Sequence, residues 1–250
     1  MDISAETLLI ILAATAYVAG FIDSIAGGGG LITVPALILA GLPPVTALGT
    51  NKLQSLFGSG SATYAYASRG HVNLKSQSGS ALLSAAGSAL GAYIATLVSS
   101  DWLRAFLPVL MIAIALYFLV KPNIDDEDRA QRMTPVVFAA TIVPAVGFYD
   151  GIFGPGTGSF FMLAFVMLAG FGLLKATAHT KLLNFASNIG AFFVFAASGA
   201  IDWKTGLIMG AAQFAGGRTG AHFAMRNGSR IIKPLLVTVC FALAAKLLFT

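Results

Sequence analysis

Four charged residues interrupt apolar stretches of the chain, and they form two repeated pairs. Asp23 precedes a run of four glycines and Lys52 lies further along, while Asp150 and Lys181 occupy the matching places in the second half. An offset of 127 residues relates the aspartates, and an offset of 129 relates the lysines. A charged group at the centre of a bilayer costs about 2.5–3.5 kcal/mol on insertion scales, so such residues predict a functional site if the chain spans a membrane.

Amide and hydroxyl side chains flank both lysines. Ammonium and carboxamide groups supply hydrogen-bond donors suited to a substrate with several oxygen acceptors, which predicts an anion site. The alternative is a lysine whose amine reaches the headgroups at the membrane surface. The candidate substrate-binding residues on these stretches are Lys52, Lys181, Asn51, Gln54, Thr180 and Asn184.

Arg218 is a further substrate-binding candidate, present in one copy because its counterpart is Ala89. It lies in an apolar segment, about eight positions before the basic loop 226–233, which corresponds to about 12 Å along a helix. Its guanidinium could bind an oxyanion through forked hydrogen bonds. A structural pair with an acid such as Asp150 would explain it as well.

Two glycine-rich elements predict breaks in helices. Residues 20–35 contain four consecutive glycines, and residues 147–158 contain Gly-Pro-Gly-Thr-Gly. Glycine disfavours helix, and irregular backbone at membrane depth is tolerated where protein or a water-filled cavity satisfies its amides. The following half-helices, starting near Leu31 and Ser159, would direct N–H groups and positive dipole ends into a central cavity, which favours an anion.

The breaks add Gly28, Gly29 and Gly156 to the substrate-binding candidates. Close helix packing by small residues is the alternative explanation for these glycines. Asp23 and Asp150 precede the breaks and are candidates to carry a proton or hold a coupling cation. Helix capping or salt bridging would explain them equally well. A carboxylate beside an anion raises the cost of binding unless it is protonated, which suggests proton coupling.

The composition places the chain in a membrane. Its 250 residues are 57% hydrophobic and 10% charged, whereas a soluble domain is about 25% charged. The formal charge of +5 is spread over loops and forms no continuous patch, which argues against nucleic-acid binding. Cys240 is the only cysteine and the histidines lack metal-ligand spacing, so no metal site or cofactor is predicted. His179 is the one histidine that could join the site.

The predicted class is an all-α polytopic membrane protein with about 8–10 membrane segments, including broken or re-entrant helices. Segments 31–42 and 135–147 are too short to cross alone, since a full span needs about 20 residues. The predicted segments are 7–22, 31–42, 48–68, 78–99, 102–120, 135–147, 158–173, 178–197, 205–225 and 234–249.

The chain divides into two homologous halves, 1–120 and 135–250, which are predicted membrane units joined by the polar linker 121–134. Inverting one half puts five basic residues of the compared loops on one side and two on the other. The positive-inside rule therefore predicts inverted repeats, with both termini outside the cytoplasm. Inverted repeats with a central site exposed to alternate sides are a recurring plan of secondary transporters.

The motifs resemble one family specifically. Asp-Ser-Ile-Ala-Gly-Gly-Gly-Gly at 23–30, Thr-Asn-Lys-Leu at 50–53 and the repeated Thr-Lys-Leu at 180–182 with Asn184 are similar to the TauE/SafE family. The resemblance covers nearly the whole chain, both halves included. It implies transport of sulfite or an organic sulfur anion such as a sulfonate, usually as export, across a bacterial-type inner membrane.

The predicted function is therefore a secondary transporter of a small anion by alternating access, with the lipid bilayer and a coupling proton or cation as further partners. A cation or metal transporter built on Asp23 and Asp150 is the alternative, although two carboxylates among lysines make a poor cation cage. An enzyme is not predicted, because nucleophile, base and orienting acid do not occur at a recognisable spacing. Such a transporter can be complete as one subunit, so the sequence does not call for an oligomer.

Overall fold

A computed structural model describes residues 4–99, 101 and 127–228. This part of the chain forms eight helices and no strand, which confirms the all-α class. The predicted segments 102–120 and 234–249 lie outside it, as does Cys240. The helices are α1 (Ala5–Ala26), α2 (Gly30–Leu39), α3 (Pro44–Ala67), α4 (Ser78–Leu97), α6 (Pro135–Ile152), α7 (Thr157–Met167), α8 (Leu173–Ala197) and α9 (Trp203–Asn227).

Local sequence signals set where several helices begin. Side-chain oxygens of Ser4, Thr134 and Asp202 accept a hydrogen bond from the backbone N–H three residues later, at the starts of α1, α6 and α9. Such caps satisfy amide donors that a helix cannot pair internally. Proline follows Thr134 at the first position of α6, where it needs no N–H partner.

Four of the described helices, α1, α4, α6 and α8, are long and apolar enough to cross a membrane. Helices α2 and α7 are apolar but contain only 10 and 11 residues. A bilayer crossing needs about 20 helical residues. The chain is a multi-pass membrane protein in which two short helices pack within the bundle.

The prediction that segment 135–147 is too short to cross was wrong. Helix α6 continues to Ile152 and spans 18 residues. The sequence interpretation took Gly147 and Gly151 as part of the break, but both are helical and pack against α4. A Cβ atom at Gly147 would lie 2.4 Å from the carbonyl oxygen of Ser84, and one at Gly151 would lie 1.9 Å from that of Ser88. These two glycines serve close packing, and the break begins after them.

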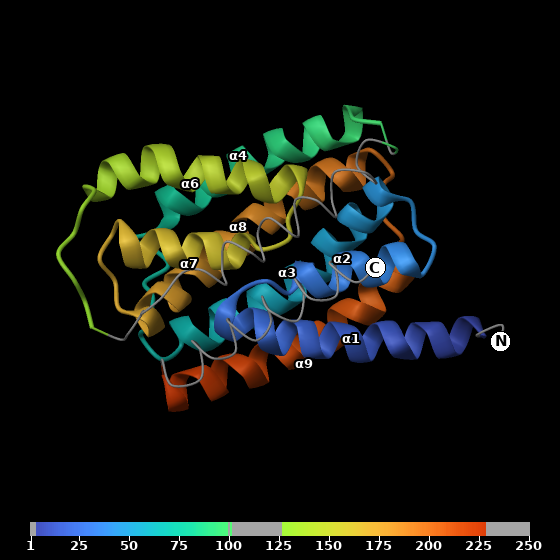
Figure 1. Ribbon diagram of the computed structural model, residues 1–250, viewed down its shortest axis with the longest axis horizontal. Coiled ribbons are helices and arrows are strands. Elements are labelled where there is room, and N and C mark those ends of the chain that lie inside the picture. Colours follow the sequence, from blue (N-terminus) through green and yellow to red (C-terminus); the bar gives the residue numbers. More distant parts are fainter. Residues whose placement is uncertain (1–3, 100, 102–126, 229–250) are drawn as a thin grey trace, which may run out of the picture.

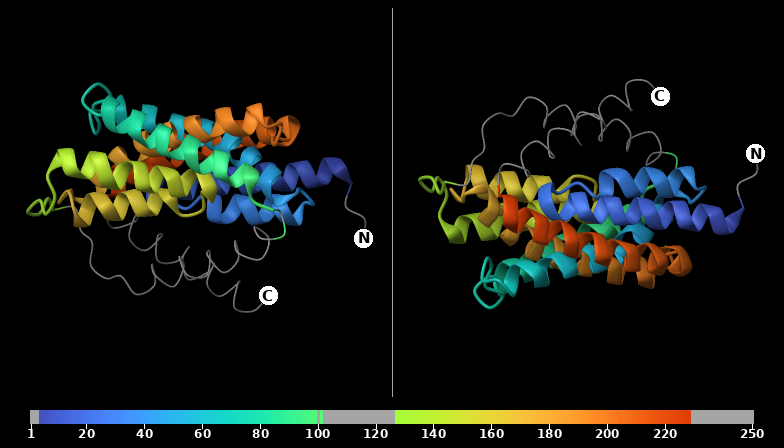
Figure 2. Two further views of the ribbon diagram at one scale, coloured as in Figure 1. Left: turned by 90° about the horizontal axis from the view of Figure 1, so that it is seen from above. Right: turned by 90° about the horizontal axis from the view of Figure 1, so that it is seen from below.

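The helices of the two halves interlock (Figures 1 and 2). Helix α1 packs along α9 and α6 packs along α4, while α3 and α8 contact each other between these pairs. In Figure 1, α1 runs leftwards from the end marked N, whereas the matching helix α6 runs rightwards. The inversion of the halves relative to a bilayer remains a prediction.

Repeated glycines line both interlocking contacts. Gly87 and Gly91 of α4 face backbone carbonyls of Pro144 and Phe148 on α6, which a Cβ atom would approach to 2.3 and 2.1 Å. The matching Gly216 and Gly220 of α9 face carbonyls of α1 in the same way. Because small residues let backbones approach closely, the sequence repeat reappears as two equivalent helix contacts.

The end of the polar linker is fastened to the start of α8. Asp128 Oδ1 accepts a hydrogen bond from the Gly172 N–H at 2.6 Å, and Asp128 Oδ2 lies 2.7 Å from Lys175 Nζ. These contacts, the hydrogen bond from Lys175 first, lower the pKa of Asp128 from its ordinary value. A carboxylate beside the first turn also suits the positive end of the helix dipole.

Substitution of Gly87 by alanine should separate α4 from α6. The added methyl group meets the Pro144 carbonyl, and overpacking of this kind costs about 1–3 kcal/mol. We expect a lower thermal unfolding temperature for Gly87→Ala in detergent. Gly79→Ala is the matched control, because Gly79 lies on the same helix with no neighbour within 4 Å of a Cβ atom. Equal unfolding temperatures for the two variants would contradict this account of the contact.

Candidate functional site

Two helix breaks lie at the centre of the bundle, as the sequence predicted. Between α1 and α2, Gly27 and Gly28 have φ angles of 78° and 93°. Between α6 and α7, Gly154 and Gly156 have φ angles of 88° and 84°. Residues with a Cβ atom rarely adopt such angles, so glycine is needed at these turns. The half-helices begin at Gly30 and Thr157, close to the predicted positions.

The two breaks touch each other. Ser159 Oγ, in the first turn of α7, donates a hydrogen bond of 2.9 Å to the Ala26 carbonyl at the end of α1. A Cβ atom at Gly27 would lie 2.3 Å from the Ser159 nitrogen. The start of each half-helix is therefore held against the break of the other half.

Each lysine of the repeat forms an ion pair with the aspartate of the other half. Lys52 Nζ on α3 lies 2.7 Å from Asp150 Oδ1 on α6, and Lys181 Nζ on α8 lies 3.0 Å from Asp23 Oδ2 on α1. The lysine side chains are 1% exposed and the aspartates 3% and 12%. The sequence left salt bridging open as one explanation of the aspartates, and the structure confirms it.

Pairing makes the four buried charges neutral in sum. An isolated charge in a low-dielectric interior costs several kcal/mol, and a partner at ion-pair distance offsets most of that cost. The lysines are therefore not free cations in this structure. An anion that binds either amine must compete with a carboxylate.

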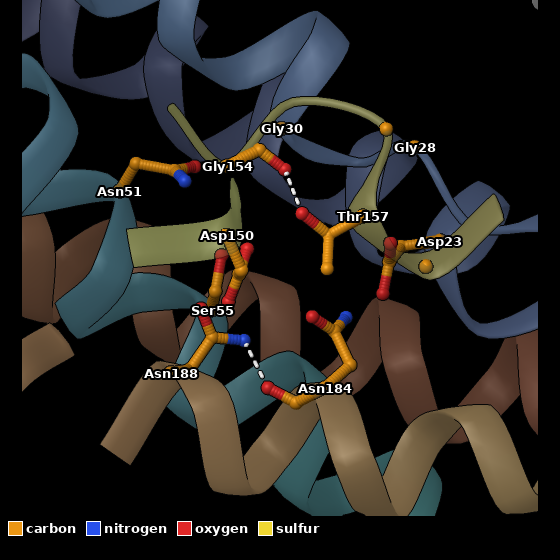
Figure 3. A pocket seen from close by; sticks show the side chains of 12 residues that line it. Asp23, Gly28, Gly30, Asn51, Ser55, Asp150, Gly154, Thr157, Asn184 and Asn188 are labelled. Carbon is orange, nitrogen blue, oxygen red and sulfur yellow. Dashed lines mark hydrogen bonds between the residues drawn. The ribbon is translucent and has the colours of Figure 1, made fainter. Parts of the chain in front are cut away.

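The polar cavity lies between these ion pairs (Figure 3). Its volume is about 20 Å³, and a cavity needs about 10–15 Å³ to hold one water molecule. Helix-break glycines, aspartates and amide side chains from both halves form its wall. The lining residues are Asp23, Gly28, Gly30, Asn51, Ser55, Asp150, Gly154, Gly156, Thr157, Gly158, Asn184 and Asn188.

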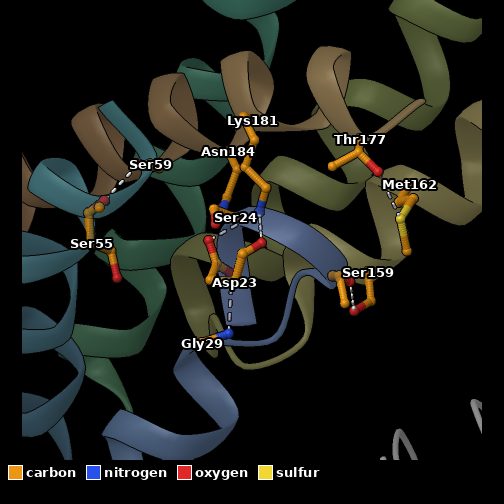
Figure 4. A network of polar contacts seen from close by, with 12 residues as sticks. Asp23, Ser24, Gly29, Ser55, Ser59, Ser159, Met162, Thr177, Lys181 and Asn184 are labelled. Carbon is orange, nitrogen blue, oxygen red and sulfur yellow. Dashed lines mark hydrogen bonds and ion pairs between the residues drawn. The ribbon is translucent and has the colours of Figure 1, made fainter. Parts of the chain in front are cut away.

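A carboxylate already occupies the start of one half-helix. Asp23 Oδ1 accepts a hydrogen bond of 3.1 Å from the Gly29 N–H, which immediately precedes α2 (Figure 4). Backbone N–H groups at a helix N-terminus attract negative charge. At this end of the cavity the backbone N–H group is therefore already paired with a carboxylate of the protein itself.

Of the predicted amide and hydroxyl residues on α3 and α8, some line the cavity and others lie outside its lining. The Asn51 side chain lines the cavity and its Oδ1 accepts hydrogen bonds from Thr33 Oγ1 at 2.7 Å and Gln54 Nε2 at 3.0 Å. Gln54 and Thr180 are buried behind the wall.

Arg218 and His179 lie away from the cavity. Arg218 is exposed on α9, with its guanidinium 5.8 Å from the centre of the Tyr64 ring. The suggested pair with Asp150 was wrong, because Asp150 faces Lys52. His179 Nδ1 lies 2.5 Å from Gln77 Nε2. Both residues belong to other parts of the bundle.

Six lining residues were missed by the sequence analysis, and the repeat itself could have revealed some of them. In the repeat with an offset of 129, Ser55 corresponds to Asn184, which was already a candidate. Asn188 lies seven positions after Lys181, on the same helix face. The missed residues are Ser55, Asn188, Gly30, Gly154, Thr157 and Gly158.

In the described ranges, His, Cys, Asp and Glu do not form a group of three that could hold a metal ion. Both aspartates of the cavity face lysines instead. The cation-transport alternative therefore finds its two carboxylates already neutralised.

Apolar helices that surround a buried polar cavity at two helix breaks are typical of membrane transporters. The sequence profile described as "Sulfite exporter TauE/SafE" matches residues 12–247. The chain belongs to the TauE/SafE family.

Curated relatives agree with this assignment. The chain is 65% identical over 241 residues to the probable membrane transporter protein ORF9 of Sinorhizobium sp., with 96% of this chain and 92% of that protein covered. It is 49% identical to the probable membrane transporter protein YfcA of Escherichia coli K12, with 97% and 90% covered. A probable membrane transporter protein of Haemophilus influenzae is 45% identical, with 100% and 97% covered. No solved structure matches the chain.

The pairing of each lysine with the aspartate of the other half can be tested by a double-mutant cycle. Lys181→Met alone leaves Asp23 buried and unpaired, and breaking a buried pair costs about 3–5 kcal/mol. Adding Asp23→Asn should recover part of the lost thermal stability in detergent. Adding Asp150→Asn instead should recover none of this stability, since Asp150 forms its ion pair with Lys52. Recovery by Asp150→Asn instead would refute the pairing.

Proposed function

We propose that this protein is a secondary transporter that exports a small anion, such as sulfite or a sulfonate, across the bacterial inner membrane by alternating access. The observation that carries the proposal is the cavity between the two breaks. It is bounded by the starts of two half-helices, one of which is already paired with a carboxylate, and by the aspartate of each buried lysine pair.

The chemistry of the cavity favours an oxyanion over a cation. Helix N-termini, ammonium groups and carboxamides all offer N–H donors, which match the oxygen acceptors of sulfite and sulfonates. The carboxylates could serve a cation, but each is neutralised by a lysine at 2.7 or 3.0 Å. An anion can replace a carboxylate on an amine without leaving an unpaired positive charge.

The size of the cavity supports a change of conformation during transport. Its volume of about 20 Å³ holds little more than one water molecule. A sulfonate is larger, so α2 and α7 must move apart to admit it. Because α1 packs on α9 and α6 on α4, the moving bodies contain helices from both halves.

Export of an anion that moves without a compensating proton or cation agrees with the electrical driving force. A potential negative inside the cell favours outward movement of an anion by about 2.3 kcal/mol per charge for each 100 mV. The substrate gradient and a coupled proton or cation are the other sources of energy.

Efflux from proteoliposomes tests this function. Vesicles loaded with sulfite or methanesulfonate should release either anion when the wild-type protein is present. Lys52→Gln and Lys181→Gln should each slow release by about tenfold or more, because a hydrogen bond to a charged group is worth about 1.5–3 kcal/mol.

Lys204→Gln serves as the control, because Lys204 is exposed at the start of α9 and its loss should leave release unchanged. Release of a divalent cation in place of both anions would replace the anion proposal by a carboxylate-based cation transporter.

A further inference from the structure

The two ion pairs differ in how completely their hydrogen bonds are satisfied. Lys181 Nζ contacts both the main-chain oxygen and the Oδ2 of Asp23. The other carboxylate oxygen of Asp23 accepts the Gly29 N–H. The Lys181–Asp23 pair is thus a closed network that also holds the start of α2 (Figure 4).

The Lys52–Asp150 pair is open by comparison. Among the described residues, Lys52 Nζ has the ion pair of 2.7 Å with Asp150 Oδ1 and no further polar contact. Asp150 Oδ2 is buried without a hydrogen-bond partner from the described part of the chain. Leaving a buried polar group unpaired costs about 1–3 kcal/mol, and more for a charged group. Such a group in a native fold requires an explanation, and a ligand is one.

The open pair faces the cavity. Asp150 lies in its wall beside Ser55 and Asn188, as Figure 3 shows. Asn184 lines the same region. Hydroxyl and carboxamide groups therefore lie close to the unsatisfied polar atoms of Lys52 and Asp150.

We propose that the anion binds to Lys52 in place of Asp150, and that Asp150 takes up one proton as it releases the amine. The Lys181–Asp23 pair stays closed and positions α2, so Lys181→Gln slows release by freeing the start of α2 and not by removing a ligand of the anion. This inference rests on the proposed function and adds its coupling ion. The substrate forms no covalent bond. The proton comes from water on the side where the anion binds and is released with the anion on the other side, when the ion pair forms again.

Charge balance explains why a proton must accompany the anion. Without it, one ammonium would face both a carboxylate and the anion in a buried site, leaving a net negative charge. Like charges in contact favour protonation of a carboxyl group. With the proton, the site is neutral both empty and loaded. Transport of a monoanion is then electroneutral, so the gradients of the anion and of the proton drive it and the membrane potential does not.

Within the ranges that the structure describes, no other ionisable group competes for this role around Asp150. The neighbouring helix α4 has Tyr93, exposed, as its only ionisable side chain, and α7 has none. On α8, Lys181 is held by Asp23, while Lys175 and His179 contact Asp128 and Gln77. Asp23 lies across the cavity with its own lysine. Tyr149, adjacent in α6, donates its hydroxyl to the Pro155 carbonyl.

The test is the pH dependence of methanesulfonate binding to the purified protein in detergent, since a sulfonate stays ionised throughout. For wild type, uptake of one proton per anion should weaken binding by up to about tenfold per pH unit in the alkaline range. Asp150→Asn cannot take up a proton, so its binding should not vary with pH. Asp150→Glu should restore the slope, which separates proton uptake from a packing defect.

Asp23→Asn is the matched control at the equivalent position. It should lower the thermal unfolding temperature, because it removes the contacts of Asp23 with Lys181 and with the Gly29 N–H at the start of α2. The pH dependence of methanesulfonate binding should keep the wild-type slope. A slope that persists in Asp150→Asn, or that vanishes in Asp23→Asn, would overturn the assignment. If the wild-type protein binds and transports methanesulfonate with an affinity and a rate that do not depend on pH, proton coupling through Asp150 is refuted and the proposed function stands. Failure of the wild type to bind or move either anion would remove both.

Discussion

Lys52 and Lys181 can carry charge inside an apolar bundle because each meets an aspartate from the other half of the chain. A lone buried ion would cost several kcal/mol, and in the described part of the chain each lysine finds its carboxylate only in the other half. The two pairs thus fix how the halves meet. They place the helix breaks against each other, and with them the starts of α2 and α7. The cavity exists where these requirements coincide.

Glycine serves two separate purposes in this arrangement. Gly27, Gly28, Gly154 and Gly156 adopt left-handed backbone angles and turn the chain at the breaks. Gly87, Gly91, Gly147 and Gly151 remain helical and allow α4 to approach α6 at backbone contact. The first set shapes the site and the second sets the distance of the helices behind it. The same amino acid therefore allows sharp turns at the helix breaks and close packing between helices.

The sequence predicted the helical class, the two breaks and the importance of the repeated charges. These features have strong local causes, namely apolar length, consecutive glycines and charge in apolar surroundings. It did not predict which aspartate meets which lysine, because that depends on how α1, α3, α6 and α8 cross in space. The end of α6 was misplaced since a glycine that packs and a glycine that turns look alike in sequence. Ser55 was overlooked because a small hydroxyl residue carries little signal until its repeat partner Asn184 is considered.

The interlocking of the halves has a consequence for how the protein is made. Synthesis proceeds from the N-terminus, so α1 enters the membrane long before α9, the helix along which it packs, has been translated. Asp23 likewise has no Lys181 to pair with until α8 has been synthesised. A carboxyl group without a partner in lipid is favoured in its neutral form. The first helices are thus held in the bilayer as a provisional assembly, and only the second half of the chain converts them into the native bundle.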